Sequence, residues 1–242
     1  MNCRKLFFTF TFVLSCISMF AQRIEYVDVA GKPDGKYLDD SSDITIEGEV
    51  LNGKKNGTWV ETYSKTEVPH FIIQFKNGKK DGLFLEFDKQ ASLLKKIEYK
   101  DGEMNGVYYQ WYKGGRLAKS FSYLNGVLHG PSVICYDRGP IQEESNYKNG
   151  LRDGLTIWYN YADREQGSKY AAYNYKDGLF EGLQETYYDN GTVKSRKMFS
   201  NNVQNGMAYE FYEDGSVKTE ANYKKGSLSG SMKEYKKGEK RL

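Results

Sequence analysis

The stretch Tyr99-Lys100-Asp101-Gly102-Glu103-Met104-Asn105-Gly106 contains the pattern that decides the fold. Two glycines stand four residues apart, and each follows an Asp or an Asn; a tyrosine stands three residues before the first glycine. Glycine and Asn adopt positive φ more readily than other residues, and Tyr favours β-strands. The stretch therefore predicts two strands joined by a turn that contains both glycines.

This pattern recurs eight times along the chain. The second glycines, for which we expect a left-handed turn conformation, are Gly57, Gly82, Gly106, Gly130, Gly154, Gly182, Gly206 and Gly230. They are separated by 25, 24, 24, 24, 28, 24 and 24 residues. Asn202 replaces the first glycine of one pair, and Asn is the residue that best imitates glycine at positive φ. Spacing of this regularity indicates a repeat architecture.

Each repeat is predicted to form one β-hairpin, such as residues 193–199 with 207–212. A second glycine turn, as at Gly115 or Gly215, leads into the next repeat. In the second strands the odd-numbered positions are more hydrophobic, so we expect that face of the sheet to be half-buried and the other face to be amphipathic. The predicted fold class is all-β: an elongated single-layer antiparallel β-meander built from about eight 24-residue hairpin repeats.

The pattern Y-x-D/N-G-x-x-x-G followed by an aromatic strand resembles the bacterial variant of the MORN repeat, over about residues 44–242. It departs from the eukaryotic form, which has a tryptophan and more glycines after the first Gly. The resemblance implies an elongated single-layer sheet that serves as a scaffold or a binding surface. Many bacterial relatives also carry an antitoxin label.

The N-terminus has the three parts of a secretory signal peptide. Arg4 and Lys5 precede an apolar run of 15 residues, from Leu6 to Phe20, and the small residue Ala21 follows. The run is shorter than the roughly 20 residues of a transmembrane helix. We expect cleavage near Ala21 and export to the periplasm, the cell surface or the medium; lipidation at Cys16 is the alternative. The predicted parts are a signal peptide (1–21), an N-terminal cap or linker (22–43) and a MORN-like repeat domain (44–242).

Composition excludes several classes of function. The net charge of the full chain is +3, and loss of the signal peptide leaves 33 basic and 32 acidic residues, so we expect no binding to nucleic acid. The mature chain keeps one cysteine, Cys135, and therefore forms no internal disulfide. We expect stability to come from repeated packing, and no transmembrane segment after the signal peptide.

Few residues suggest chemistry. His70 and His129 lie in different repeats, and His129 stands where other repeats have a turn-forming Asn or Asp, so a turn residue is favoured over a metal ligand. Cys135 aligns with aromatic core positions, which favours a small buried residue over a nucleophile. We predict no catalytic residue, no metal site and no cofactor.

One periodic surface signal remains. Six residues after the second glycine, five repeats carry a tyrosine: Tyr63, Tyr112, Tyr136, Tyr188 and Tyr212. One interpretation is that these tyrosines only cover a thin sheet. The other is an aromatic track that binds an extended peptide, a partner protein or a glycan.

The sequence therefore predicts an exported, non-enzymatic repeat protein that acts as a protein-binding or scaffold module. A carbohydrate-binding protein of the cell envelope is one alternative, because aromatic repeats also suit stacking on sugars. An antitoxin or immunity protein is another, but it needs an exported toxin, since a signal peptide would separate the protein from a cytoplasmic one.

Overall fold

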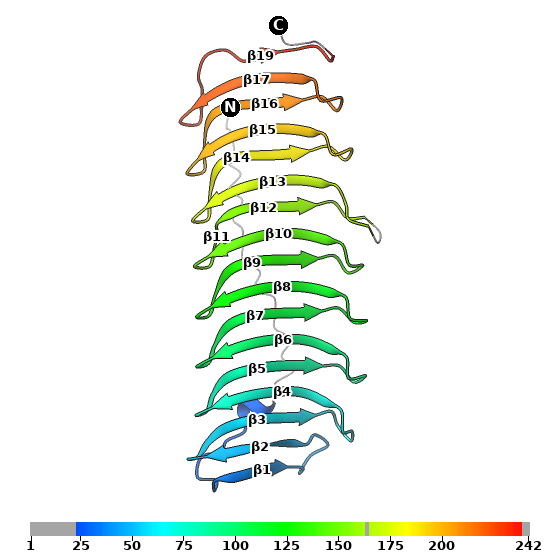
Figure 1. Ribbon diagram of the computed structural model, residues 1–242, viewed down its shortest axis with the longest axis vertical. Helices are drawn as coiled ribbons and strands as arrows, with labels where there is room; N and C mark the ends of the chain where they lie inside the picture. Colours follow the sequence, from blue (N-terminus) through cyan, green and yellow to red (C-terminus); the bar gives the residue numbers. More distant parts are fainter. Residues whose placement is uncertain (1–22, 163–164, 239–242) are drawn as a thin grey trace, which may run out of the picture.

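The computed structural model describes residues 23–162 and 165–238. They form one antiparallel sheet of 19 strands that follow one another in chain order (Figure 1). Neighbouring strands pair, except that β11 and β12 both pair with β10, and β18 and β19 both pair with β17. The all-β meander expected from the sequence is confirmed. The predicted signal peptide, its cleavage site and Cys16 lie outside the described residues.

The described part of the chain starts with a short helix at Arg23 and then runs through the strands in order. The elements are α1 (Arg23–Tyr26), β1 (Gly35–Asp39), β2 (Ile46–Leu51), β3 (Lys54–Thr62), β4 (Pro69–Lys76), β5 (Lys79–Phe87), β6 (Leu93–Lys100), β7 (Glu103–Trp111), β8 (Leu117–Leu124), β9 (Val127–Cys135), β10 (Ile141–Lys148), β11 (Leu151–Arg152), β12 (Gly154–Tyr159), β13 (Lys169–Lys176), β14 (Leu179–Tyr187), β15 (Val193–Ser200), β16 (Val203–Phe211), β17 (Val217–Lys224), β18 (Ser227–Leu228) and β19 (Lys233–Glu234). We number the repeats 1 to 8 by their second glycines, from Gly57 to Gly230.

The tight turn of each hairpin uses two residues, not the whole glycine pair. Asp101 and Gly102 have φ angles of 49° and 96°, and Lys100 pairs directly with Glu103. Two central residues with positive φ are typical of the type I′ turn, whose twist matches that of a hairpin. The second strand therefore begins at residue 103, earlier than the sequence pattern suggested.

The second glycine consequently lies inside a strand in six of the eight repeats, at a β-bulge, whereas Gly154 begins β12 and Gly230 follows β18. Gly106 has a φ of 119°, and the β6–β7 register shifts between Ile97 and Tyr99. All eight second glycines have positive φ. We call them bulge glycines, because they bend the strand and do not reverse the chain.

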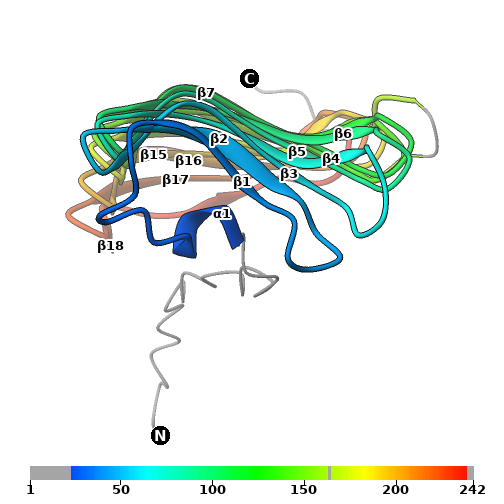
Figure 2. The ribbon, with the colours of Figure 1, turned by 90° about the horizontal axis from the view of Figure 1, so that it is seen from below.

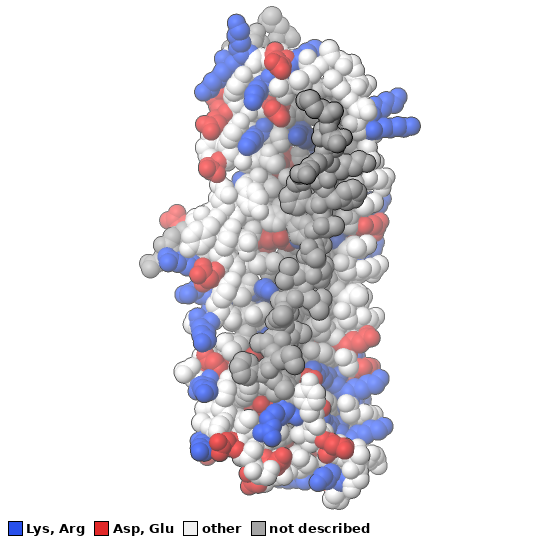
Figure 3. All heavy atoms as spheres, turned by 180° about the vertical axis from the view of Figure 1, so that it is seen from behind, with Lys and Arg blue, Asp and Glu red and all other residues white. Residues whose placement is uncertain are grey.

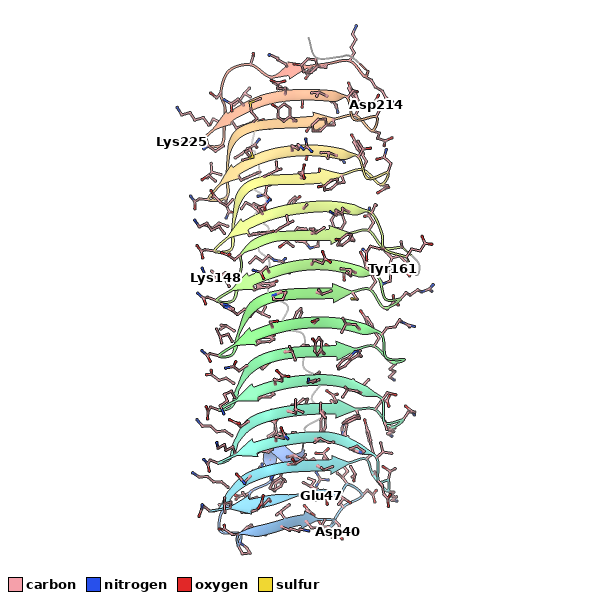
Figure 4. All side chains as sticks on the ribbon, in the orientation of Figure 1. Asp40, Glu47, Lys148, Tyr161, Asp214 and Lys225 are labelled. Atoms are coloured by element: carbon pink, nitrogen blue, oxygen red, sulfur yellow. The ribbon has the colours of Figure 1, made fainter. Side chains whose placement is uncertain are left out.

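Both long edges of the sheet contain bonds between successive repeats. At the edge of the tight turns, the backbone N–H of Gly102 donates to the carbonyl of Lys80 in the preceding repeat, and equivalent bonds recur along the chain. In Figure 4, Lys148 and Lys225 mark this edge, while Tyr161 and Asp214 mark the opposite edge, where one repeat passes to the next. The 28-residue spacing between Gly154 and Gly182 places its extra residues at that opposite edge, between β12 and β13.

The sheet is curved, and α1 lies under its concave side (Figure 2). The most buried large side chains belong to this side: Trp59 and Ile73 have no exposed surface, and Phe84 is nearly buried. The odd-numbered positions Leu83 and Leu85 lie on the convex face and are half-buried. The sequence thus identified a half-buried face, but the deeper burial is on the opposite face, to which Trp59 and Phe84 belong, because curvature and α1 both cover that side.

The bulge predicts a measurable cost for any side chain at Gly106. An ideal Cβ there lies 2.2 Å from Oε2 of Glu98, which accepts a hydrogen bond from the Val107 N–H. At Gly182, also at positive φ, a Cβ has nothing within 4 Å. We expect Gly182→Ala to lower the free energy of unfolding by about 1–2 kcal/mol through backbone strain alone, and Gly106→Ala to lower it further.

Urea unfolding of both variants measures the difference. Combining Gly106→Ala with Glu98→Ala removes the contact with Oε2 and leaves only the Cβ of residue 98, at 3.0 Å, so the cost of adding Ala at position 106 should fall toward that at position 182. Equal costs at the two glycines in the presence of Glu98 would contradict the steric part of this account.

Candidate binding site on the concave face

A continuous row of side chains runs along the middle of the concave face. Strand register pairs each member with the next, from Trp59 on β3 to Ala221 on β17. We call it the concave row; its members are Trp59, Ile73, Phe84, Ile97, Tyr108, Phe121, Ser132, Ser145, Thr156, Tyr173, Gln184, Lys197, Ala208 and Ala221. The side chains change along the row from large and apolar to small or polar.

Opposite charges flank the first part of this row. Lys55 and Lys80 stand two residues before their bulge glycines, on the side of the tight turns. Glu61 and Glu86 stand four residues after the bulge glycines, on the other side of the row. Figure 3 views the concave face and shows side chains of both signs of charge along the parts of its long edges and ends that are visible. A segment lying on the row therefore meets cations on one side and carboxylates on the other.

Residues 23–29 of the chain itself lie on this face, and we call them the N-terminal segment. Ile24 is fully buried in a cluster that includes Trp59 and Ile73. The backbone N–H of Ile24 donates to Oε2 of Glu61 at 3.2 Å, and Nζ of Lys55 donates to the carbonyls of Ile24 and Glu25. This part of the concave face thus holds a polypeptide segment through both its backbone and an aliphatic side chain.

The charged groups that hold the N-terminal segment interact with one another and with its backbone. Burial lowers the pKa of Lys55, while the carboxylates of Glu25 and Asp28 act in the opposite direction. Glu25 also forms an ion pair with Lys80. Because Glu61 is only 1 % exposed, its bonds to Ile24 N–H and to His70 Nδ1, the latter at 3.3 Å, provide the partners that a buried carboxylate needs.

A second charged group lies on the concave face in repeat 5. Arg152 forms an ion pair with Glu143 at 2.7 Å, and its guanidinium lies 5.3 Å from the centre of the Trp158 ring. Glu143 also accepts hydrogen bonds from Ser145 Oγ and from Trp158 Nε1. Because Arg152, Ser145 and Trp158 already occupy the Glu143 carboxylate, we assign it a structural role.

The five tyrosines proposed from the sequence as a binding track stand where each repeat leaves its second strand. In every one of them the hydroxyl donates to a backbone carbonyl of the following repeat. The bonds run from Tyr63 to Phe87, Tyr112 to Cys135, Tyr136 to Tyr159, Tyr188 to Phe211 and Tyr212 to Tyr235, at 2.7–3.0 Å. These bonds join successive repeats, which agrees with the interpretation that the tyrosines cover the thin sheet. The aromatic binding track remains a prediction. The repeat spacing of the tyrosines was visible in the sequence, but the direction of the hydroxyl toward residue i+23, or i+24 for Tyr63, was not.

The other reactive side chains have structural surroundings. Cys135 is free and buried, and burial raises the pKa of its thiol, which disfavours the nucleophilic thiolate. His70 stacks on Tyr63 with ring centres 4.3 Å apart. His129 lies within β9 beside a bulge glycine, not in a tight turn as the sequence suggested. Across residues 23–162 and 165–238, no group of three or more His, Cys, Asp or Glu side chains is placed to hold a metal ion.

Two repeats match a known family model. Residues 180–201 and 204–225, each of which contains one bulge glycine (Gly182 or Gly206) and the strand that follows its repeat, match the model described as the MORN repeat variant. A search of the curated proteins found no match. None of the described helices has the length and hydrophobicity needed to cross a membrane. The comparison thus supports the family resemblance directly for these two repeats, and a MORN repeat suggests a binding or scaffold role.

The tyrosine bonds predict a stability effect that a purely solvent-facing track would not show. Tyr112→Phe and Tyr188→Phe each remove one hydroxyl and leave a backbone carbonyl without its partner. We expect each to lower the free energy of unfolding by about 0.5–1.5 kcal/mol. Tyr161→Phe is the matched control, because Tyr161 is exposed and packs its ring on Tyr136 without such a bond. Thermal and urea unfolding of the three variants compare them; a Tyr112→Phe variant as stable as Tyr161→Phe would remove the structural interpretation.

The buried tyrosines of the concave face predict unfolding at alkaline pH. Burial raises the pKa of Tyr99, Tyr108 and Tyr175 to about 12. A folded-state pKa above the unfolded value of about 10 stabilises the fold below that pH, and this contribution is lost as the pH rises toward 12. Tyr108→Phe should therefore reduce the loss of stability between these two pH values. Tyrosinate absorbance followed with far-ultraviolet circular dichroism measures both events; an unchanged pH dependence would contradict the assignment.

Proposed function

We propose that the protein is an exported, non-enzymatic binding or scaffold protein whose concave face holds a polypeptide segment of a partner. One observation carries the proposal: this face already holds the N-terminal segment through Glu61, Lys55 and the pocket for Ile24. Hydrogen bonds to backbone N–H and C=O groups are independent of side-chain identity, so the same chemistry serves other segments.

The shape of the face supports an elongated ligand. The concave row continues for many strands beyond α1, which contacts β3. Repetition at a fixed spacing suits a partner that extends along several repeats. Aromatic side chains such as Tyr108, Phe121 and Tyr173 give the continuation of the row apolar contact area, which is the main source of binding energy at protein interfaces.

Export is the part of the proposal that rests on sequence alone. The arrangement of basic, apolar and small residues in Met1–Ala21 supports cleavage near Ala21. A carbohydrate of the cell envelope and an exported toxin are the alternative ligands. Crosslinking to the concave face distinguishes them from a scaffold partner, because each gives a different crosslinked product.

One experiment in the native host tests location and surface together. A photoreactive phenylalanine is placed at Tyr108 or at Tyr109, which are adjacent in sequence but lie on the concave and the convex face. We expect the exported protein to begin near Gln22 and to crosslink one partner protein in stoichiometric yield from position 108 only. Phe121 provides a second concave position if replacement at 108 impairs folding.

The outcomes separate the alternatives. N-terminal sequencing that finds Met1 or a lipid-modified Cys16 on the exported form contradicts the expected cleavage. Capture of a glycan favours the carbohydrate alternative, and capture of one toxin favours the immunity alternative. Equal yields from positions 108 and 109 would argue against the concave face as the binding surface.

A further inference from the structure

Repeat 7 reproduces part of the site that holds the N-terminal segment in repeat 1. Glu210 stands four residues after its bulge glycine, as Glu61 does in repeat 1. Ala208 occupies the position of Trp59 in the concave row. The acceptor for a backbone N–H is therefore retained, while the large indole is replaced by a methyl group.

This replacement leaves a hollow on the concave face. Ala208 and its row neighbour Ala221 form the floor, and the hollow has a volume of about 340 Å³. Its lining includes Lys197, Glu210, Tyr223 and Met232. The space is sufficient for one aliphatic side chain with room for its backbone, and Lys197 forms no ion pair within residues 23–162 and 165–238.

An unpaired polar atom lies beside the hollow. Gln184 precedes Lys197 in the concave row and is 6 % exposed. Its Nε2 donates to the carbonyl of Asn174 at 2.9 Å, which fixes the orientation of the amide. Its Oε1 has no hydrogen-bond partner among the residues that the structure describes. A buried acceptor without a partner costs free energy, and Gln184 is not among the residues that line the hollow.

We propose that the hollow over Ala208 and Ala221 binds an aliphatic–acidic segment of a partner polypeptide, in the manner that repeat 1 binds Ile24 and Glu25. This inference rests on the proposed function. The aliphatic side chain occupies the hollow, the acidic side chain pairs with Lys197 as Glu25 pairs with Lys80, and a backbone N–H group donates to Glu210 as that of Ile24 donates to Glu61. The same combination of an aliphatic contact, an ion pair and a backbone N–H acceptor is occupied in repeat 1.

The probe is a synthetic peptide with the sequence of residues 23–31, acetylated and amidated, because the protein demonstrably accommodates this segment. Calorimetric titration into the mature chain should give saturable one-to-one binding. Ala208→Phe fills the hollow, and aromatic residues already occupy that position in repeats 1 to 3, so the fold tolerates the change. We expect the Ala208→Phe variant to bind the peptide at least about tenfold more weakly than the wild type.

Ser132→Phe is the matched control, since it places the same side chain at the same register position in repeat 4, and it should leave binding unchanged. Lys197→Met should weaken binding about threefold at low salt. A peptide with Glu replaced by Gln at its third residue should lose the same factor, and the two changes together should cost no more than one.

The result that overturns the proposal is absence of binding, or equal binding by wild type and Ala208→Phe. Equal loss in Ser132→Phe and Ala208→Phe would also overturn it, because the effect would then not be local to repeat 7. The proposed function fails independently, through convex-face or absent crosslinks in the native host. A partner that crosslinks to Tyr108 while the peptide ignores Ala208→Phe would leave the concave face as the binding surface and remove only this site.

Discussion

A sheet of one layer has no second layer against which to bury its side chains, so the structure depends on hydrogen bonds between neighbouring backbones. Each bulge interrupts that ladder and leaves carbonyl groups that need other donors. Side chains provide them: Trp59 Nε1 donates to the carbonyl of Glu49 in repeat 1, and Gln184 Nε2 donates to that of Asn174, the equivalent residue in repeat 6. Tyrosine hydroxyls do the same where one repeat passes to the next.

The backbone conformation that the turns and bulges require explains why the sequence is rich in glycine and in strand-forming aromatic residues. Positive φ at the turn and again at the bulge favours glycine, Asn or Asp at fixed positions, and the strand on either side favours side chains that pack on a half-buried surface. Curvature then makes the two faces unequal. The concave face gathers its side chains, and the N-terminal segment completes burial there over repeats 1 and 2.

The same face offers different surfaces along its length. At the N-terminal end, Trp59 and Phe84 with Ile24 form a compact core. Toward the C-terminal end, Ala208 and Ala221 leave space, and Lys197 remains unpaired within the described part of the chain. A repeated backbone thus carries a graded surface, because the strand ladder constrains the glycines and leaves the row positions free to vary.

The sequence by itself determined the repeat length, the strand-rich class and the single-layer meander, because these follow from local φ preferences and from a spacing repeated eight times. The sequence pattern placed the bulge glycines within a turn. A two-residue type I′ turn followed by a bulge uses the same residue types as one longer turn, so the sequence could not distinguish the two. It could not choose the more buried face or the direction of the Tyr112 hydroxyl. Only the tertiary structure decided these, because sheet curvature, the docking of Ile24 and the hydrogen bond to Cys135 each join residues that are distant along the chain.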